Sequence, residues 1–231
     1  MARTAFDFIA PFLTIWVRPR ATIRKIVDSD PTRLVLLIAG TSSVLSCFIV
    51  QHWLKILPRT SQMPHEYFVS GLYAQGILAL FNPSGTWQSR GTEDASLILA
   101  AAFVGALLLY FSGAILKWTG RLFGGTATGV EARAAFAWSQ VPLIIALMCR
   151  LSSWIDSHGT QGTPSNGLLL TGYVVFFIWW LIALIKCVSE VHHFSAWRGL
   201  GAVVLWLYSI PLPPLLGMLI FSLGRSLASR R

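Results

Sequence analysis

The sequence predicts an all-α membrane protein with five transmembrane helices, N-terminal interfacial amphipathic helices and an extramembrane loop between spans one and two. Of its 231 residues, 55% are hydrophobic and 12% are charged, whereas about 25% of the residues in a soluble domain are charged. Apolar runs of about 20 residues, which cross a hydrocarbon core of roughly 30 Å, recur along the chain. The 18 Lys and Arg residues stand at the ends of these runs. This distribution favours anionic lipid headgroups as partners and argues against nucleic acid.

Residues 1–33 are expected to form an amphipathic interfacial segment. Apolar residues recur at three- and four-residue steps between Phe6 and Val27, with breaks at Pro11 and Pro19. The second half of the segment is crowded by four cations, Arg18, Arg20, Arg24 and Lys25. This pattern predicts a segment lying in a negatively charged membrane interface, and a cytosolic cap packed on the membrane bundle is the equal alternative. Asp7 and Pro11 interrupt the short first apolar run, and most basic residues of this segment follow it, so we expect no cleaved signal peptide here.

The membrane domain is expected to occupy residues 34–231, with spans at about 34–54, 96–116, 134–154, 168–185 and 200–223. Small and mildly polar residues, such as Ser42 and Ser43, make one side of the first span suitable for packing against another helix. The apolar stretch 67–81 is short for a span, which favours five spans over six, and whether it lies on the surface, dips into the membrane or crosses it stays open. With five spans, 11 of the 18 Lys and Arg lie on the N-terminal side. This bias predicts a cytoplasmic N-terminus in the cell inner membrane.

A charged, Gly-rich turn separates the second and third spans. Gly124 and Gly125 allow the backbone to turn sharply, and Thr128 and Glu131 have the spacing of a capping box that would start a helix near Gly129. Farther along that helix, Pro142 removes one backbone hydrogen-bond donor. We assign turn and cap roles to Gly124, Gly125, Glu131, Pro142 and Glu190.

The sequence contains no catalytic motif. HExxH, GxSxG and P-loop patterns are missing, so we expect no enzyme, no catalytic residue and no cofactor. The most metal-like stretch is Glu190-Val191-His192-His193, but adjacent histidines on a helix point about 100° apart. A polar connector between spans four and five is therefore favoured over a metal site, and the three cysteines, which show no CxxC spacing, are expected to be small buried hydrophobes.

Three segments together resemble a known family. They are FLTIWVRPRATIRKIVDSDP at Phe12–Pro31, GRLFGG with FAWSQVP within Gly120–Pro142, and SEVHHFSAWRGL at Ser189–Leu200. Their order is similar to that in the bacterial branch of the Yip family, multi-span membrane proteins named for interacting with Ypt and Rab GTPases. The resemblance implies a five-span helical domain with a cytoplasmic N-terminus, and a role in membrane traffic or shaping through partner proteins, as in eukaryotic relatives. It implies no catalytic residue. The chain departs from those relatives in lacking a long N-terminal cytosolic region, so the resemblance by itself does not extend to GTPase binding.

We therefore expect a non-enzymatic membrane scaffold or membrane-organising protein. The alternative is a small-molecule or lipid transporter with a path near Ser139, Gln140, Pro142 and the broken fifth span at Pro211–Pro214. On the five-span topology the family-like segments share one side and form a face for anionic lipid or an acidic partner. The residues assigned to this face are Arg18, Arg20, Arg24, Lys25, Arg121, Arg133, His192, His193 and Arg198. Positive charge that only sets orientation is the competing explanation, and a protein partner and a homo-oligomer stay open.

Overall fold

The computed structural model describes residues 5–56, 91–159 and 165–209, and within them the side chains of residues 10–47, 98–149 and 171–209. All regular structure in these ranges is helical, which confirms the all-α prediction for this part of the chain. The helices are α1 (Ala5–Val17), α2 (Pro19–Ser29), α3 (Val35–Ile56), α5 (Gly91–Leu122), α6 (Gly129–Gly159), α7 (Ser165–Val191) and α8 (Ala196–Ser209).

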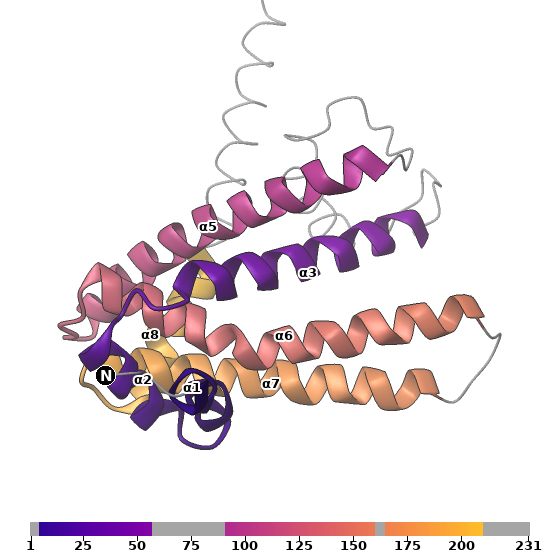
Figure 1. Ribbon diagram of the computed structural model, residues 1–231. Coiled ribbons are helices and arrows are strands. Elements are labelled where there is room, and N and C mark those ends of the chain that lie inside the picture. Colours follow the sequence, from indigo (N-terminus) through magenta and orange to yellow (C-terminus); the bar gives the residue numbers. More distant parts are fainter. Residues whose placement is uncertain (1–4, 57–90, 160–164, 210–231) are drawn as a thin grey trace, which may run out of the picture.

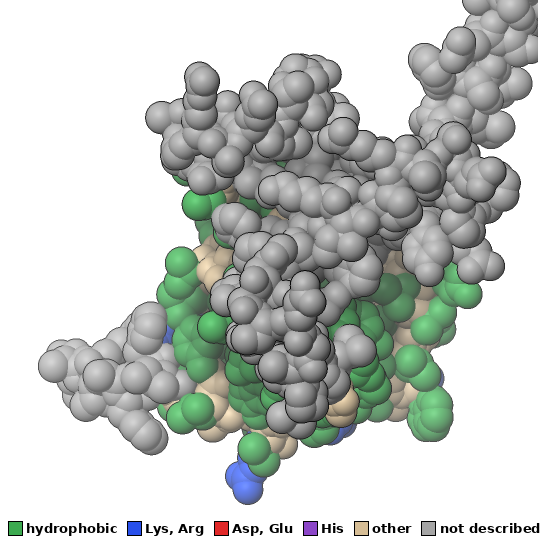
Figure 2. Space-filling view, turned by 90° about the vertical axis from the view of Figure 1, so that its right-hand side faces the viewer, with side chains coloured by type: hydrophobic (Ala, Val, Ile, Leu, Met, Phe, Trp, Pro, Cys, Tyr) green, Lys and Arg blue, Asp and Glu red, His purple; other side chains and the backbone are tan. Residues whose placement is uncertain are grey.

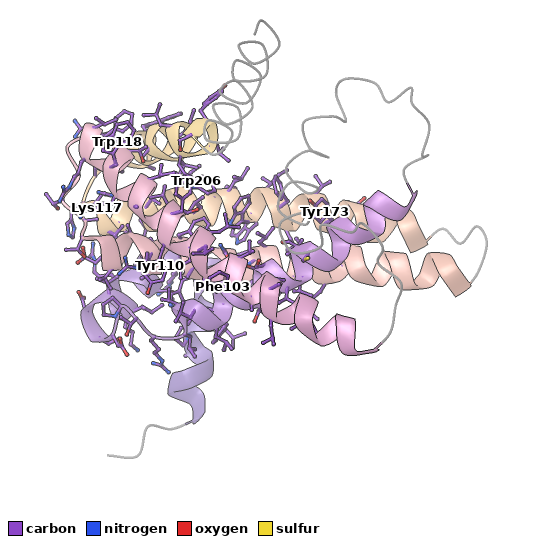
Figure 3. All side chains as sticks on the ribbon, turned by 90° about the horizontal axis from the view of Figure 1, so that it is seen from above. Phe103, Tyr110, Lys117, Trp118, Tyr173 and Trp206 are labelled. Atoms are coloured by element: carbon purple, nitrogen blue, oxygen red, sulfur yellow. The ribbon has the colours of Figure 1, made fainter. Side chains whose placement is uncertain are left out.

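The four long helices α3, α5, α6 and α7 run side by side as a bundle (Figure 1). The turn from α5 to α6 and the turn from α7 to α8 lie at the same end of this bundle, and α2 lies there too. We call this the loop end and define it by residues 18–30, 121–133 and 190–198. Helix α1 is seen nearly end-on in Figure 1 and runs across the bundle direction in Figure 3, so it lies crosswise to the long helices.

Three of the described helices contain stretches long and apolar enough to cross a membrane. These are Ile98–Leu122 in α5, Gly129–Cys149 in α6 and Thr171–Val191 in α7. A shorter apolar stretch, Val35–Cys47, lies in α3. Large apolar side chains such as Phe103 and Leu107 are exposed on α5, and Figure 2 shows hydrophobic side chains over most of the visible described surface, with few Lys or Arg. Such a surface suits contact with acyl chains.

The helices extend beyond the apolar runs that predict them. Helix α5 begins at Gly91 and continues to Leu122, past the predicted end of the second span at residue 116. Helix α6 begins at Gly129, where the capping-box spacing places it, and continues through Pro142 to Gly159. The hydrocarbon boundary and the helix end are set by different forces, so the two need not coincide. The predicted stretch 67–81 and the second half of the fifth predicted span lie outside the described residues.

Helix α6 forms the centre of the bundle. Every residue from Ala134 to Pro142 is buried, including Trp138, which is fully enclosed. Alanine occupies several of these positions, so neighbouring helices approach closely, as is usual between helices in lipid. The buried segment contains two polar side chains, Ser139 and Gln140.

Small polar residues of α3 join this helix to its neighbours, as the sequence predicts. The Ser43 hydroxyl donates to the Ala101 carbonyl of α5 at 2.8 Å. The Ser42 hydroxyl donates to Oε1 of Gln140 in α6. A Cβ on Gly105 would meet both Ser43 and the α3 backbone, so α3 and α5 pack at a distance that only glycine allows here.

The N-terminal helices pack against the bundle. The Phe12 ring lies 5.0 Å from the Trp138 ring, and the Trp16 ring meets Phe176 edge-on at 5.5 Å. Ile15 in α1 and the isoleucines of α2 are buried. The packing of α1 and α2 on the bundle agrees with the cap alternative. The crosswise direction of α1 is also compatible with an interfacial helix, and that location stays a prediction.

Candidate functional site

The end of α5 is closed by a Schellman motif at the Gly-rich turn. Gly124 has φ +83°, and its N–H donates to the Arg121 carbonyl at 3.0 Å. The Gly125 N–H donates to the Gly120 carbonyl at 2.9 Å. This pair of bonds satisfies carbonyls that the helix end would leave free. The left-handed conformation of Gly124 is one that glycine adopts without strain.

The end of α7 is closed by the same motif, but with histidine in the left-handed position. His193 has φ +57°, and its N–H donates to the Glu190 carbonyl at 3.1 Å. The Phe194 N–H donates to the Ser189 carbonyl at 3.1 Å. A left-handed conformation costs a non-glycine residue about 1 kcal/mol or more, so the surroundings of this turn hold it in place. The exposed His193 side chain points away from the bundle core.

His192 packs between the end of α5 and the end of α7. Its side chain is 1% exposed, and its ring stacks on Phe194 with centroids 5.2 Å apart and planes 8° apart. A Cβ on Gly120 or on Gly125 would overlap the imidazole, so glycine at both positions makes room for the ring. The sequence predicts a polar connector between spans four and five, whereas His192 joins the end of α7 to the end of α5.

Burial lowers the pKa of His192, and the nearby Leu116 carbonyl opposes this shift in part. The ring is therefore neutral near pH 7. The sequence-based assignment of His192 to a cationic surface is wrong for this reason: the side chain is both buried and uncharged. No group of three potential metal ligands occurs among the described residues.

Glu131 caps the start of α6. The Thr128 N–H donates to its Oε2 at 2.6 Å, and the Glu131 N–H donates back to the Thr128 hydroxyl at 3.4 Å. This is the reciprocal arrangement that the Thr128–Glu131 spacing indicates. Arg133, the next charged residue of α6, packs against α5. It contacts Gly113, and its guanidinium lies 4.7 Å from the centre of the Tyr110 ring. Arg133 is thus held between α5 and α6 and is only half-buried.

Glu190 pairs with Arg24 and so ties α2 to the end of α7. The Glu190 side chain is 11% exposed and the Arg24 side chain 65% exposed. Sequence reasoning gave Glu190 a loop-holding role but did not identify its partner, which lies 166 positions earlier in the chain. The pair leaves Arg24 on the surface with its charge balanced.

The remaining cations of the predicted face are exposed at the loop end. They come from three separate segments and have no ion pair within the described residues: Arg18, Arg20, Lys25, Arg121 and Arg198. Two exposed tryptophans accompany them, Trp118 in α5 and Trp197 in α8. Figure 3 shows Lys117 and Trp118 at this end, while Phe103 lies farther along the bundle.

Sequence reasoning did not assign these two tryptophans to the face. The signal was available, because Trp beside Lys or Arg at the end of an apolar run is typical of the membrane–water interface. We define the cationic face as the five exposed cations together with Trp118 and Trp197. Its chemistry suits phosphate and carboxylate groups at the level where a bilayer meets water.

The comparisons with known proteins give one match. The family model of the Yip1 domain matches residues 13–216, which is nearly the whole chain. Neither the search of curated proteins nor the search of solved structures returned a match. The matched range includes α2, both loop-end turns and the described part of α8.

Proposed function

Because the chain belongs to the Yip1 domain family and is a multi-pass membrane protein, we propose that it is a non-enzymatic scaffold that organises the membrane by binding anionic headgroups at its cationic face. The observation that carries this proposal is the convergence of exposed cations from three distant segments on one end of the bundle. Each contributes about 1 kcal/mol near an anionic leaflet, so five give at most about 5 kcal/mol before screening by salt.

The proposal includes a topology. The loop end faces the cytoplasm of a cell with an inner membrane, and five spans cross, of which α8 begins the last. Three features support this: the bias of Lys and Arg toward the loop end, the exposed tryptophans there and the crosswise α1. The charge bias is typical of the cytoplasmic side, and the tryptophans and the crosswise helix are typical of a membrane–water interface on either side.

Transport is the less favoured function. A transport path near Ser139, Gln140 and the fifth span would need hydrated space beside these side chains. The first two residues are instead buried in α6, where the Ser139 hydroxyl donates to the Phe136 carbonyl at 2.7 Å and Gln140 accepts from Ser42. Ser139 and Gln140 therefore face neighbouring helices and expose almost no polar surface to a substrate. The prolines of the fifth span lie outside the described residues.

Lipid selection by the full chain in nanodiscs tests the proposal. The measurement is the enrichment of phosphatidylglycerol over phosphatidylcholine next to the protein, read from lipids retained in native mass spectrometry. A nanodisc has no cytoplasmic side, so this readout separates binding from charge that merely sets orientation.

Two variants of equal charge change provide the comparison. One replaces four cations of the cationic face with Gln at Arg18, Arg20, Lys25 and Arg121. The matched control replaces with Gln four cations that the proposed five-span topology assigns to the opposite side of the membrane, Lys55, Arg59, Arg90 and Arg150. We expect the first variant to lose the enrichment and the control to keep it. Equal loss in both variants, or no enrichment by the natural chain, would contradict the proposal.

A further inference from the structure

Helices α1 and α2 enclose a pocket that the sequence does not foreshadow. Its volume is about 340 Å³, and it is lined by residues of both helices and of the segment after α2. The lining includes the cations Arg18 and Lys25 and the hydroxyls of Thr14 and Thr22. The Thr22 hydroxyl lies 2.9 Å from the Thr14 hydroxyl, so the two helices are joined at the pocket wall.

The charge of this pocket favours an anion. Arg18, Lys25 and Arg33 line it together with one carboxylate, that of Asp30. An oxygen of Asp30 is already engaged, because Oδ1 accepts from the Thr32 N–H at 3.0 Å and from the Thr32 hydroxyl at 2.7 Å. Three cations against one carboxylate leave the lining positive, and Arg18 and Lys25 supply the donors that a phosphate group needs.

The depth of the pocket favours a lipid over a soluble anion. Phe12 of α1 packs on Trp138, which is seven residues and thus about 10 Å along α6 from Glu131 at the loop end. An interfacial helix lies about 5–10 Å into the boundary between headgroups and acyl chains. Arg24 of α2 pairs with Glu190 at the loop end itself. On the proposed topology, these contacts place the α1–α2 region near the level where a headgroup meets its acyl chains.

Apolar side chains flank the pocket on α1. Leu13 is 63% exposed and Val17 is 78% exposed. Leu13 lies three residues after Ala10, and Val17 lies three residues after Thr14; Ala10 and Thr14 line the pocket. A ligand with a phosphate in the pocket and a hydrocarbon chain along Leu13 and Val17 would satisfy both surfaces.

We infer that the α1–α2 pocket is a discrete binding site for the phosphate headgroup of one anionic glycerophospholipid, held by Arg18 and Lys25. This inference rests on the proposed function and sharpens it, since it separates one defined site from diffuse attraction to the whole cationic face. Arg20 and Arg121 belong to that face but do not line the pocket, and so they provide the contrast.

Two pairs of variants test the site in the full chain, with phosphatidylglycerol in nanodiscs as the probe. The first pair removes two charges: Arg18→Gln with Lys25→Gln at the pocket, against Arg20→Gln with Arg121→Gln outside it. Two cations account for roughly 30-fold in affinity. We expect a loss of about that size or more from the pocket variant and a clearly smaller loss from the control.

The second pair keeps every charge. Ala21→Phe adds a ring at an exposed position that lines the pocket, whereas Ala196→Phe adds one at an exposed position at the start of α8. We expect phosphatidylglycerol retention to fall only in Ala21→Phe. Because neither position is buried, both variants should fold, which circular dichroism checks.

The outcomes distinguish this inference from its alternatives and from the proposed function. If both charge variants lose binding equally and Ala21→Phe has no effect, the discrete site is refuted while the cationic face stands. If the natural chain shows no preference for phosphatidylglycerol, the proposed function fails as well. Displacement of the lipid by inorganic phosphate would show a site for soluble phosphate, and displacement by an acidic peptide would show a protein partner; each result would overturn the lipid assignment.

Discussion

Replacing Gly120 with Ala should separate the ends of α5 and α7. A Cβ at this position would overlap the imidazole of His192, which is enclosed by Gly125 on one side and stacked on Phe194 on the other. The ring has no vacant space into which it can move without disturbing one of these contacts. The substitution should therefore force the helix ends apart or expel the ring.

Two opposing effects set the magnitude. Alanine in place of glycine inside a helix gains up to about 1 kcal/mol of helix propensity. Overpacking a well-packed site costs about 1–3 kcal/mol. We expect a net loss of about 1–2 kcal/mol in the free energy of unfolding. Gly129→Ala is the matched control, because the nearest atoms to its Cβ would be the Lys117 and Arg133 side chains at ordinary distances of 3.8 Å and 3.7 Å.

Thermal denaturation of the full chain in detergent, followed with a thiol-reactive dye, measures the effect. Cys187 is fully buried near the end of α7 and becomes reactive when the helix ends separate. Gly120→Ala should denature at lower temperature than Gly129→Ala. Adding His192→Ala should recover part of the loss, with a coupling energy of about 1 kcal/mol. Equal stability of the two glycine variants, or no rescue by His192→Ala, would refute the reasoning.

Three further predictions concern other contacts of the loop end and the bundle. Because burial lowers the pKa of His192, the unfolded chain binds more protons, so stability is full above the unfolded pKa of about 6.5 and falls as the pH drops through the folded pKa. Denaturation midpoints measured across this range should lose that component in His192→Asn, and an unchanged pH profile would contradict it. Ser42→Ala should cost about 1–3 kcal/mol because it strands the buried Gln140 amide, whereas adding Gln140→Leu should restore most of the midpoint; no recovery would mean the bond is unimportant. Arg24→Glu should place two carboxylates together and speed proteolysis of the N-terminal segment. The exchange of Arg24→Glu with Glu190→Arg should slow proteolysis again. The free energy recovered should be no more than about 1 kcal/mol, because the residue-24 side of the pair is exposed. Equal digestion of the single and double variants would exclude the pair as the tether.

Local features of the fold were predictable from the sequence because they depend on neighbouring residues. Thr128 and Glu131 lie three positions apart, and that spacing alone indicates where α6 begins. The small polar side of the first span indicates a helix-packing surface, and Ser42 and Ser43 both bond to other helices. In each case the chemistry of one turn of helix decides the outcome.

Contacts between distant segments could not be predicted in the same way. Nothing near Glu190 indicates Arg24 as its partner, and nothing near His192 indicates that two glycines of α5 leave room for its ring. A histidine beside a carboxylate at a helix end is consistent with an exposed cation as well as with a buried connector. Burial decides between them, and it depends on how α5, α7 and α2 meet.

The position where α5 ends could not be predicted from hydropathy. Hydropathy places the end of the second span at residue 116, but the helix continues until Gly124 takes the left-handed conformation that closes it. Gly124 marks the helix end, whereas Lys117 marks only the end of the apolar run in the sequence. The helical residues 117–122 beyond the predicted span place Trp118 and Arg121 on the cationic face.

Photo-crosslinking with a phosphatidylglycerol that carries a photoreactive group in its headgroup tests the central claim most directly. The full chain is reconstituted with this lipid as a minor component, and the crosslinked peptides are identified by mass spectrometry. The account predicts that crosslinks concentrate in residues 18–30, 121–133 and 190–198, with α2 foremost. Crosslinks spread evenly along the chain, or concentrated away from the loop end, would contradict it.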